Sequence, residues 1–286
     1  MKLTEYYRPS TLEEALRLRT KKPDARFIAG GTDLLVRIRA GVERPTVLIS
    51  LRNIEELKGI NLGKSTEIGS MTTISEILEH PTLGEAYPVL LDAARPFASM
   101  QIRNQATVGG NLCNASPCAD MAQVLLVLDA RVRIAGPGGR REMSLNEFFL
   151  GEGKTHLSPD EVLTSIVIDE LPPQARASYM KKRRVQMDLA LVSVAVLLEM
   201  NGARCTRARV AAGAVAPRPL RLRGVEDQLE DQRIDSNLLM RASELAKQEV
   251  SPITDVRTSA EYRRHMTGVL FRRAAEKVLD GRNDES

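Results

Sequence analysis

The stretch "PFASMQIRNQATVGGNLCNASPCAD" (residues 96–120) is rich in small and polar residues and carries two of the three cysteines of the chain, Cys113 and Cys118. Its centre is the paired-glycine turn TVGGN, residues 107–111. Three interpretations fit such a stretch: a metal site, a redox-active cysteine pair, or a backbone cradle for an anion. The choice among these three interpretations also determines which fold class the sequence indicates.

The cysteines fit a metal site poorly. Zinc and iron–sulfur sites take four ligands at close spacing, whereas Cys205 lies about 90 residues beyond Cys118 and the three histidines are isolated. An odd number of cysteines is also a poor disulfide framework and suits a reducing compartment. We therefore predict no metal ligands and interpret Cys113 and Cys118 as small structural residues. A disulfide switch between them is the alternative.

A second paired-glycine turn, "AGGTDL", lies at residues 29–34. We name residues 29–34 the first elbow and residues 107–111 the second elbow. Glycine permits positive φ and leaves no Cβ between the backbone N–H groups and a ligand. Neither elbow fits G-x-G-x-x-G or the P-loop pattern, which disfavours a Rossmann or Walker site. Two elbows could grip the two phosphates of one dinucleotide; the alternative is that each is a tight turn.

The pattern of the whole chain predicts a mixed α and β fold. Ser10 or Thr11 could cap a first helix, Thr32 or Asp33 a second. Pro172-Pro173 marks a boundary, and Asn201-Gly202 is a hairpin turn between two strands, the first of which would also fit a buried helix. We expect strands over 27–29, 46–51 and 161–169, a hairpin turn at 137–139, and helices over 10–20, 236–250 and 259–281.

Composition is that of a soluble globular protein, with 43% hydrophobic and 27% charged residues. No apolar run reaches the roughly 18 residues of a membrane span, and the N-terminus has no apolar signal-peptide region. The sequence therefore predicts a cytoplasmic protein with no membrane span.

The charge is unevenly distributed. Residues 172–286 hold 21 Lys and Arg against 15 Asp and Glu, a balance of +6 where the whole chain has +4. Such an excess fits nucleic acid, an anionic cofactor or a docking face, although a solvated arginine-rich face is its commonest cause. The arginines of residues 261–277 fall in adjacent pairs, and aromatic stacking platforms are scarce, so we predict no nucleic-acid partner.

Three segments together resemble the FAD-binding subunit of the molybdenum hydroxylases, the family of xanthine dehydrogenase, carbon monoxide dehydrogenase and aldehyde oxidase. They are residues 29–34, residues 96–120 and "RRVQMDLALVSVAV" at 183–196. Residues 212–221 and 262–274 are similar to the family's C-terminal domain. The resemblance implies an α+β chain: an FAD-binding domain of the vanillyl-alcohol-oxidase type in two subdomains (1–55 and 56–172), followed by an α+β C-terminal domain (173–286).

The resemblance also implies a cofactor, FAD, and its contacts. The two elbows would hold the pyrophosphate, Asp120 would contact the ribose region, and Phe97 would lie against the isoalloxazine ring. From the residues alone, Phe97 could instead be a core residue and Asp120 a helix N-cap. Leu191 stands where some members carry a lysine near the flavin. The expected FAD-binding residues are Ile28, Ala29, Gly30, Gly31, Thr32, Asp33, Leu34, Leu35, Phe97, Thr107, Gly110, Asn111, Asn114, Asp120, Val162 and Leu163.

The function implied by the resemblance is that of a flavin relay in a multi-subunit oxidoreductase. Electrons from a molybdenum centre would pass through two iron–sulfur clusters to FAD, and from FAD to NAD or another acceptor. The chain has too few cysteines for the clusters and is too short for the molybdopterin subunit. Its expected partners are therefore an iron–sulfur subunit and a molybdopterin-binding subunit. A stand-alone flavin oxidase or reductase of the same fold is the alternative, ahead of a nucleic-acid-binding protein.

Overall fold

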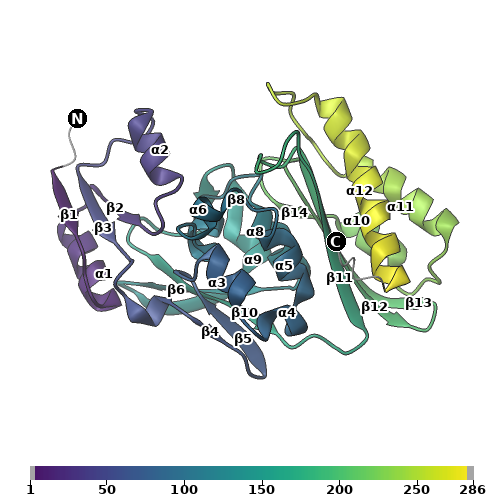
Figure 1. The fold of residues 1–286 in the computed structure, drawn as a ribbon, viewed down its shortest axis with the longest axis horizontal. Coiled ribbons are helices and arrows are strands. Elements are labelled where there is room, and N and C mark those ends of the chain that lie inside the picture. The colour runs from purple at the N-terminus through teal and green to yellow at the C-terminus, as the bar shows by residue number, and fades with distance from the viewer. Residues whose placement is uncertain (1–3, 282–286) are drawn as a thin grey trace.

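The computed structural model describes residues 4–281. Figure 1 shows three sheets arranged along the long axis of the molecule. The N-terminal sheet lies at one end, a five-stranded sheet lies in the middle, and a four-stranded sheet with its covering helices lies at the other end. Within the described residues, no helix is both long and apolar enough to cross a membrane.

The N-terminal sheet is parallel, with strand order β1 (Glu5–Tyr7), β3 (Val47–Ser50), β2 (Ala25–Ile28). Thr11 caps α1 (Leu12–Lys21) by accepting a 3.2 Å hydrogen bond from the N–H of Glu14, which confirms the predicted cap. The second predicted cap is right in position only, since Asp33 is the N-cap residue of the second helix. Asp33 precedes α2 (Leu34–Arg39), but its backbone is already helical and its carboxylate makes no capping bond.

The middle sheet is antiparallel, in the order β4 (Ile60–Asn61), β5 (Ser65–Gly69), β10 (Val162–Asp169), β6 (Arg131–Gly136), β7 (Gly139–Ser144). The predicted hairpin turn is confirmed, since Gly136 pairs with Gly139. Short helices and a two-stranded ribbon complete this layer: η1 (Glu55–Leu57), α3 (Ile74–Glu79), α4 (Leu83–Ala86), α5 (Pro88–Ala94), α6 (Met100–Arg103), α7 (Val108–Cys113), α8 (Asp120–Val127), α9 (Leu145–Phe148), β8 (Phe149–Gly151) and β9 (Lys154–Thr155).

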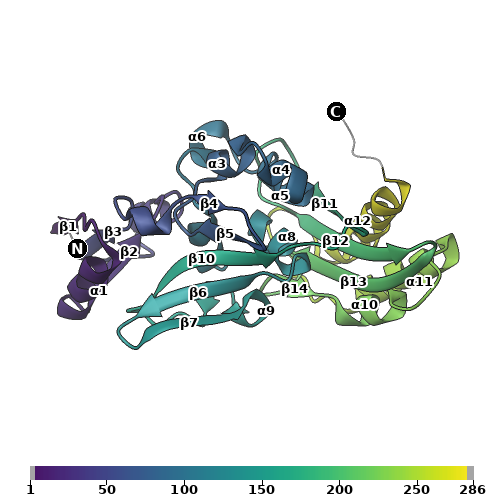
Figure 2. The same ribbon diagram turned by 90° about the horizontal axis from the view of Figure 1, so that it is seen from below.

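The last sheet is antiparallel, in the order β11 (Ala175–Lys182), β12 (Val192–Asn201), β13 (Arg204–Gly213), β14 (Leu220–Arg221). Helices α10 (Arg223–Leu229), α11 (Ser236–Gln248) and α12 (Ala260–Asp280) pack together on one face of this sheet, at the C-terminal end of the molecule (Figure 2). Alternate residues of β12 enter different cores: Val194 packs with the helices and Ala195 with the middle layer. Burial of both faces explains why this strand is as apolar as a buried helix.

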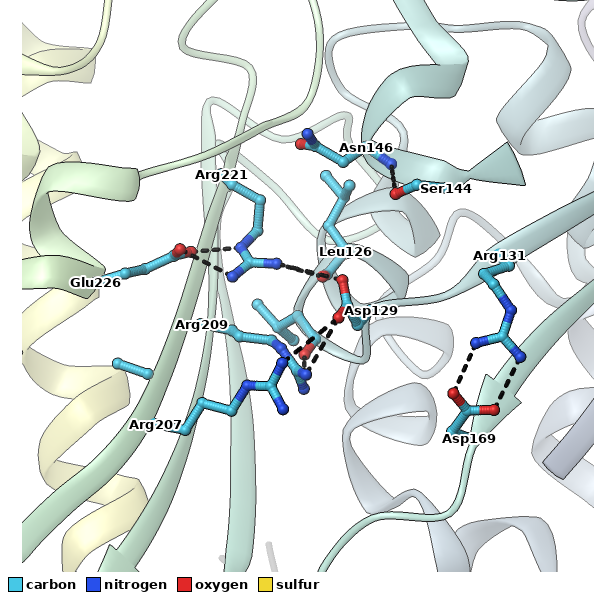
Figure 3. Close-up of polar contacts among 12 residues, drawn as sticks. Leu126, Asp129, Arg131, Ser144, Asn146, Asp169, Arg207, Arg209, Arg221 and Glu226 are labelled. Atoms are coloured by element: carbon cyan, nitrogen blue, oxygen red, sulfur yellow. Dashed lines mark hydrogen bonds and ion pairs between the residues drawn. The ribbon is translucent and has the colours of Figure 1, made fainter. Parts of the chain in front are cut away.

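Helix α8 lies between the middle layer and the last sheet. All eight of its residues are buried, because α5 and α7 cover one side and β12 and β13 the other. At its C-terminal end, Arg221 and Arg209 approach the carbonyl oxygens of Leu126 and Val127 at 3.4 and 3.5 Å (Figure 3). Cations at this end offset the negative pole of the helix. Some of the excess arginines of residues 172–286 are therefore buried at the end of α8, and only the others can form a solvated face.

Candidate functional site

The two elbows lie side by side, although more than 70 residues separate them in the sequence. A Cβ added to Gly30 would stand 1.8 Å from the carbonyl oxygen of Gln105, two residues before the second elbow. A Cβ on Gly110 would lie 3.7 Å from the Cβ of Ala29. The structure thus places the two turns where a single ligand can contact both, as the dinucleotide hypothesis requires.

The first elbow offers free backbone donors. Within residues 4–281, the N–H groups from Gly30 to Leu34 donate no hydrogen bond; the next N–H, of Leu35, is bonded to the Gly31 carbonyl at 3.1 Å. Gly31 has a φ of +77°, which turns the chain so that consecutive N–H groups are presented together. Consecutive unpaired N–H groups form an anion-binding concavity. This elbow fits a pyrophosphate.

The second elbow differs from the first. The N–H groups of residues 108–111 all donate inside the protein, to oxygen atoms of Thr72, Ser70 and Thr107 at 2.9 to 3.0 Å. Residues 108–111 therefore offer no free N–H group to a ligand. What this elbow offers instead is a side chain: the Oδ1 atom of Asn111 is buried and has no hydrogen-bond partner among the described residues.

Three other predicted positions, Asn114, Val162 and Leu163, lie near the second elbow. Asn114 ends α7. Val162 and Leu163 lie on β10, beside α7, and their side chains point into two different hydrophobic cores. The side chains of Val162 and Leu163 are therefore used in core packing.

Phe97 lies in a tightly held turn. It is half-buried and packs against the middle core, so the core-packing interpretation describes part of its surface. Arg103 donates to the carbonyl oxygens of Phe97 and Ala98 at 3.0 and 3.2 Å. Arg183 and Lys181 approach the carbonyl oxygen of Pro96 at 3.3 and 3.5 Å. Three cations therefore surround this turn.

Asp120 is buried at the start of α8 and faces the last sheet. Its carboxylate accepts hydrogen bonds from the Tyr179 hydroxyl at 2.9 Å and the Lys181 ammonium at 2.8 Å. Burial raises the pKa of Asp120, and Lys181 and Tyr179 oppose that rise. The N-cap position belongs to Ala119, so the N-cap interpretation of Asp120 is wrong.

Tyr179 and Lys181 are the residues of this site that sequence reasoning missed, because it predicted no strand over β11. The signal was present in "SYMKK" (178–182): residues two apart on a strand share a face, so Tyr179 and Lys181 point together toward α8 while Met180 packs with the helices.

The combined donor set fits an anionic ligand that also carries hydroxyl groups. Unpaired N–H groups suit phosphate oxygens, and the Oδ1 atom of Asn111 and the spare lone pairs of Asp120 can accept from hydroxyls. Across residues 4–281, no cluster of three or more His, Cys, Asp or Glu side chains could hold a metal ion.

Comparison with known proteins agrees with this geometry. Residues 2–170 match the family described as "FAD binding domain in molybdopterin dehydrogenase", and residues 177–278 match "CO dehydrogenase flavoprotein C-terminal domain". The chain is 32% identical to the xanthine dehydrogenase FAD-binding subunit of Escherichia coli, covering 96% of this chain and 95% of that one. It is 34% identical to the carbon monoxide dehydrogenase medium chain of Afipia carboxidovorans, with 96% of each covered. The solved carbon monoxide dehydrogenase of Hydrogenophaga pseudoflava superposes with a TM-score of 0.95, at 30% identity over 98% of each chain.

Proposed function

Because the chain belongs to the FAD-binding medium subunits of the molybdenum hydroxylase family, we propose that it carries electrons from iron–sulfur clusters on a partner subunit, through FAD, to NAD or another acceptor. The protein is an oxidoreductase flavoprotein subunit with FAD as its cofactor. Bound FAD supplies the change between one-electron and two-electron transfer. The chain's own residues bind the cofactor and orient it.

One observation carries this proposal: the unpaired N–H groups of residues 30–34 face a second elbow whose N–H groups are already used. An anion can add to the first elbow without breaking a bond of the protein. In this proposal the first elbow, with Ile28 and Leu35 at its ends, holds the pyrophosphate. The site is closed from the other side by Thr107, Gly110, Asn111 and Asn114. Asp120 accepts hydrogen bonds from hydroxyl groups of the cofactor, and Phe97 supplies a surface for its ring. The backbone at Val162 and Leu163 lies along the cofactor.

The proposed partners are an iron–sulfur subunit and a molybdopterin-binding subunit. Relatives are named as medium chains or FAD-binding subunits, which favours a subunit over a stand-alone flavin oxidase. We also propose the division into an FAD-binding pair of subdomains, 1–55 and 56–172, and a C-terminal domain, 173–286. Each range contains one of the three large sheets.

Purification of the full-length chain with its complex tests the function. We expect about one FAD per chain by absorbance and co-purification of chains that contain iron and molybdenum. Rapid anaerobic mixing with the substrate of the complex should reduce the clusters before the flavin, and NAD should then reoxidise the flavin. Reduction of the flavin by a substrate in the isolated chain would instead support a stand-alone oxidase. Absence of FAD would contradict the proposal.

A further inference from the structure

The seam between the middle layer and the last sheet contains a buried ion pair. The side chains of Lys181 and Asp120 are 3% and 6% exposed, and their charged atoms are 2.8 Å apart. The same ammonium lies 3.5 Å from the carbonyl oxygen of Pro96, which precedes Phe97. One cation of the C-terminal part therefore contacts two segments of the flavin site.

We propose that Lys181 is a positioning residue of the flavin site, which fixes the Asp120 carboxylate and the Pro96–Phe97 backbone so that the C-terminal domain completes the site. The inference rests on the proposed function, because Asp120 and Phe97 are proposed FAD contacts. It adds a residue outside the FAD-binding domain to the machinery that holds the cofactor.

Stability alone does not account for this pair. Two charges lose their hydration when they are buried, and apolar residues of similar volume in such a seam are often equally or more stabilising. The hydrogen-bonding capacity of the pair is also only partly used. A carboxylate can accept about four hydrogen bonds, and Asp120 accepts two from Tyr179 and Lys181 among the described residues. The remaining lone pairs are held in a fixed orientation and can accept from a ligand's hydroxyls.

The charges around Asp120 make the role testable by pH. Lys181 and Tyr179 on β11 face the carboxylate directly, and Arg183 contributes a weaker favourable charge. Ser193 and Cys118 are the other polar side chains near the hydroxyl of Tyr179. Burial already raises the pKa of Asp120. Loss of the ammonium removes the strongest opposing charge, so the pKa rises further and the carboxylate protonates nearer to neutral pH.

The experiment is a fluorescence titration of FAD into full-length protein stripped of its flavin, from pH 6 to pH 9. For Lys181→Met we expect roughly tenfold weaker binding at pH 7, about 1.4 kcal/mol. The defect should grow as the pH falls, whereas wild-type affinity changes little. In an Asp120→Asn background the same substitution should cost little more, because Lys181 acts through that carboxylate.

Two variants serve as controls. Lys182→Met removes an exposed ammonium from the next position of the same strand and should leave FAD affinity unchanged. Arg209→Met removes a buried cation at the other end of α8; it should lower the unfolding temperature with unchanged FAD affinity. The inference would be overturned if Lys181→Met kept the wild-type FAD affinity and pH profile, or if Arg209→Met lost FAD to the same extent. In either case, FAD binding by the wild-type chain would still support the proposed function. A wild-type chain that binds no FAD would overturn both.

Discussion

Gly30 and Gln105 are in direct backbone contact, with no room for a side-chain atom between the Cα of the glycine and the carbonyl of the glutamine. Arg52 strengthens the same junction by donating a 2.8 Å hydrogen bond to the side chain of Gln105. The contact joins the N-terminal layer to the segment that leads into the second elbow. The proposed cofactor site thus depends on an approach that only glycine permits.

Replacing Gly30 by alanine tests this dependence. The added Cβ would overlap the Gln105 carbonyl and force the elbows apart, which we expect to cost about 1–3 kcal/mol. The FAD content of the purified protein and its unfolding temperature should both fall. Gly138→Ala is the matched control, because nothing lies within 4 Å of a Cβ at that turn. Full FAD occupancy in Gly30→Ala would show that the elbows do not share the ligand.

Thr107→Val removes the hydroxyl that caps α7. Its Oγ1 atom accepts a 3.0 Å hydrogen bond from the N–H of Gly110, and Thr107 is buried. Loss of a cap of this kind costs about 1 kcal/mol. We expect lower stability in urea together with weaker FAD binding, and we expect Thr107→Ser to retain both. Equal losses in the serine variant would assign the effect to packing of the methyl group.

Asp255 predicts how stability depends on pH. Burial alone would raise the pKa of Asp255, but hydrogen bonds from Arg257 and Arg263 outweigh it and hold the pKa well below the usual value. A carboxyl with a lowered pKa stabilises the fold above the unfolded-state pKa of about 3.9 and loses this contribution as the pH falls below it. The wild-type protein should therefore lose stability as the pH decreases from 5 to 3.

Asp255→Asn should lose that stability already at pH 7. Arg263 is 1% exposed, so loss of the negative charge at position 255 leaves a buried guanidinium with neutral acceptors, among them the carbonyl oxygens of Leu191 and Ala214. We expect a cost of about 3 kcal/mol, measured by urea unfolding at pH 7 and pH 3.5. The difference between variant and wild type should shrink at the lower pH. A constant difference would mean that the pKa of Asp255 is the same in the folded and unfolded states.

The cysteines should be chemically silent. Burial raises the pKa of Cys113 to about 12 and that of Cys205 to about 11, so both remain protonated at pH 8. Iodoacetamide should leave these two thiols unmodified in the native protein and label them after unfolding. Serine at both Cys113 and Cys118 should leave the FAD content unchanged. Loss of FAD only under oxidising conditions, and only with both cysteines present, would support the disulfide switch instead.

Local pattern was sufficient to predict the two glycine turns and the helices α1, α2, α11 and α12, because glycine pairs, caps and periodic apolar residues act over a few positions. The difference between the elbows was not predictable in this way. Two of the acceptors that use the second elbow's N–H groups, the carbonyl oxygens of Ser70 and Thr72, come from a segment more than 30 residues earlier in the chain, while Thr107 supplies the others locally. The partners of Asp120 lie about 60 residues later, on β11. The lysines and the arginine of that strand interrupt the alternation of apolar and polar residues by which a strand is recognised. Tertiary contacts, which a local pattern does not show, therefore determine both the state of the second elbow and the surroundings of Asp120.

The complete burial of α8 has a consequence for biosynthesis. A helix that is buried on all sides needs two covering layers, and β12 and β13, which supply one of them, are translated more than 60 residues after it. While the ribosome is still adding residues beyond 170, the nascent chain has an apolar helix with one side uncovered. We therefore expect FAD to be loaded only after β12 and β13 have been synthesised, and we expect chains that terminate before β12 to aggregate instead of forming a smaller flavoprotein.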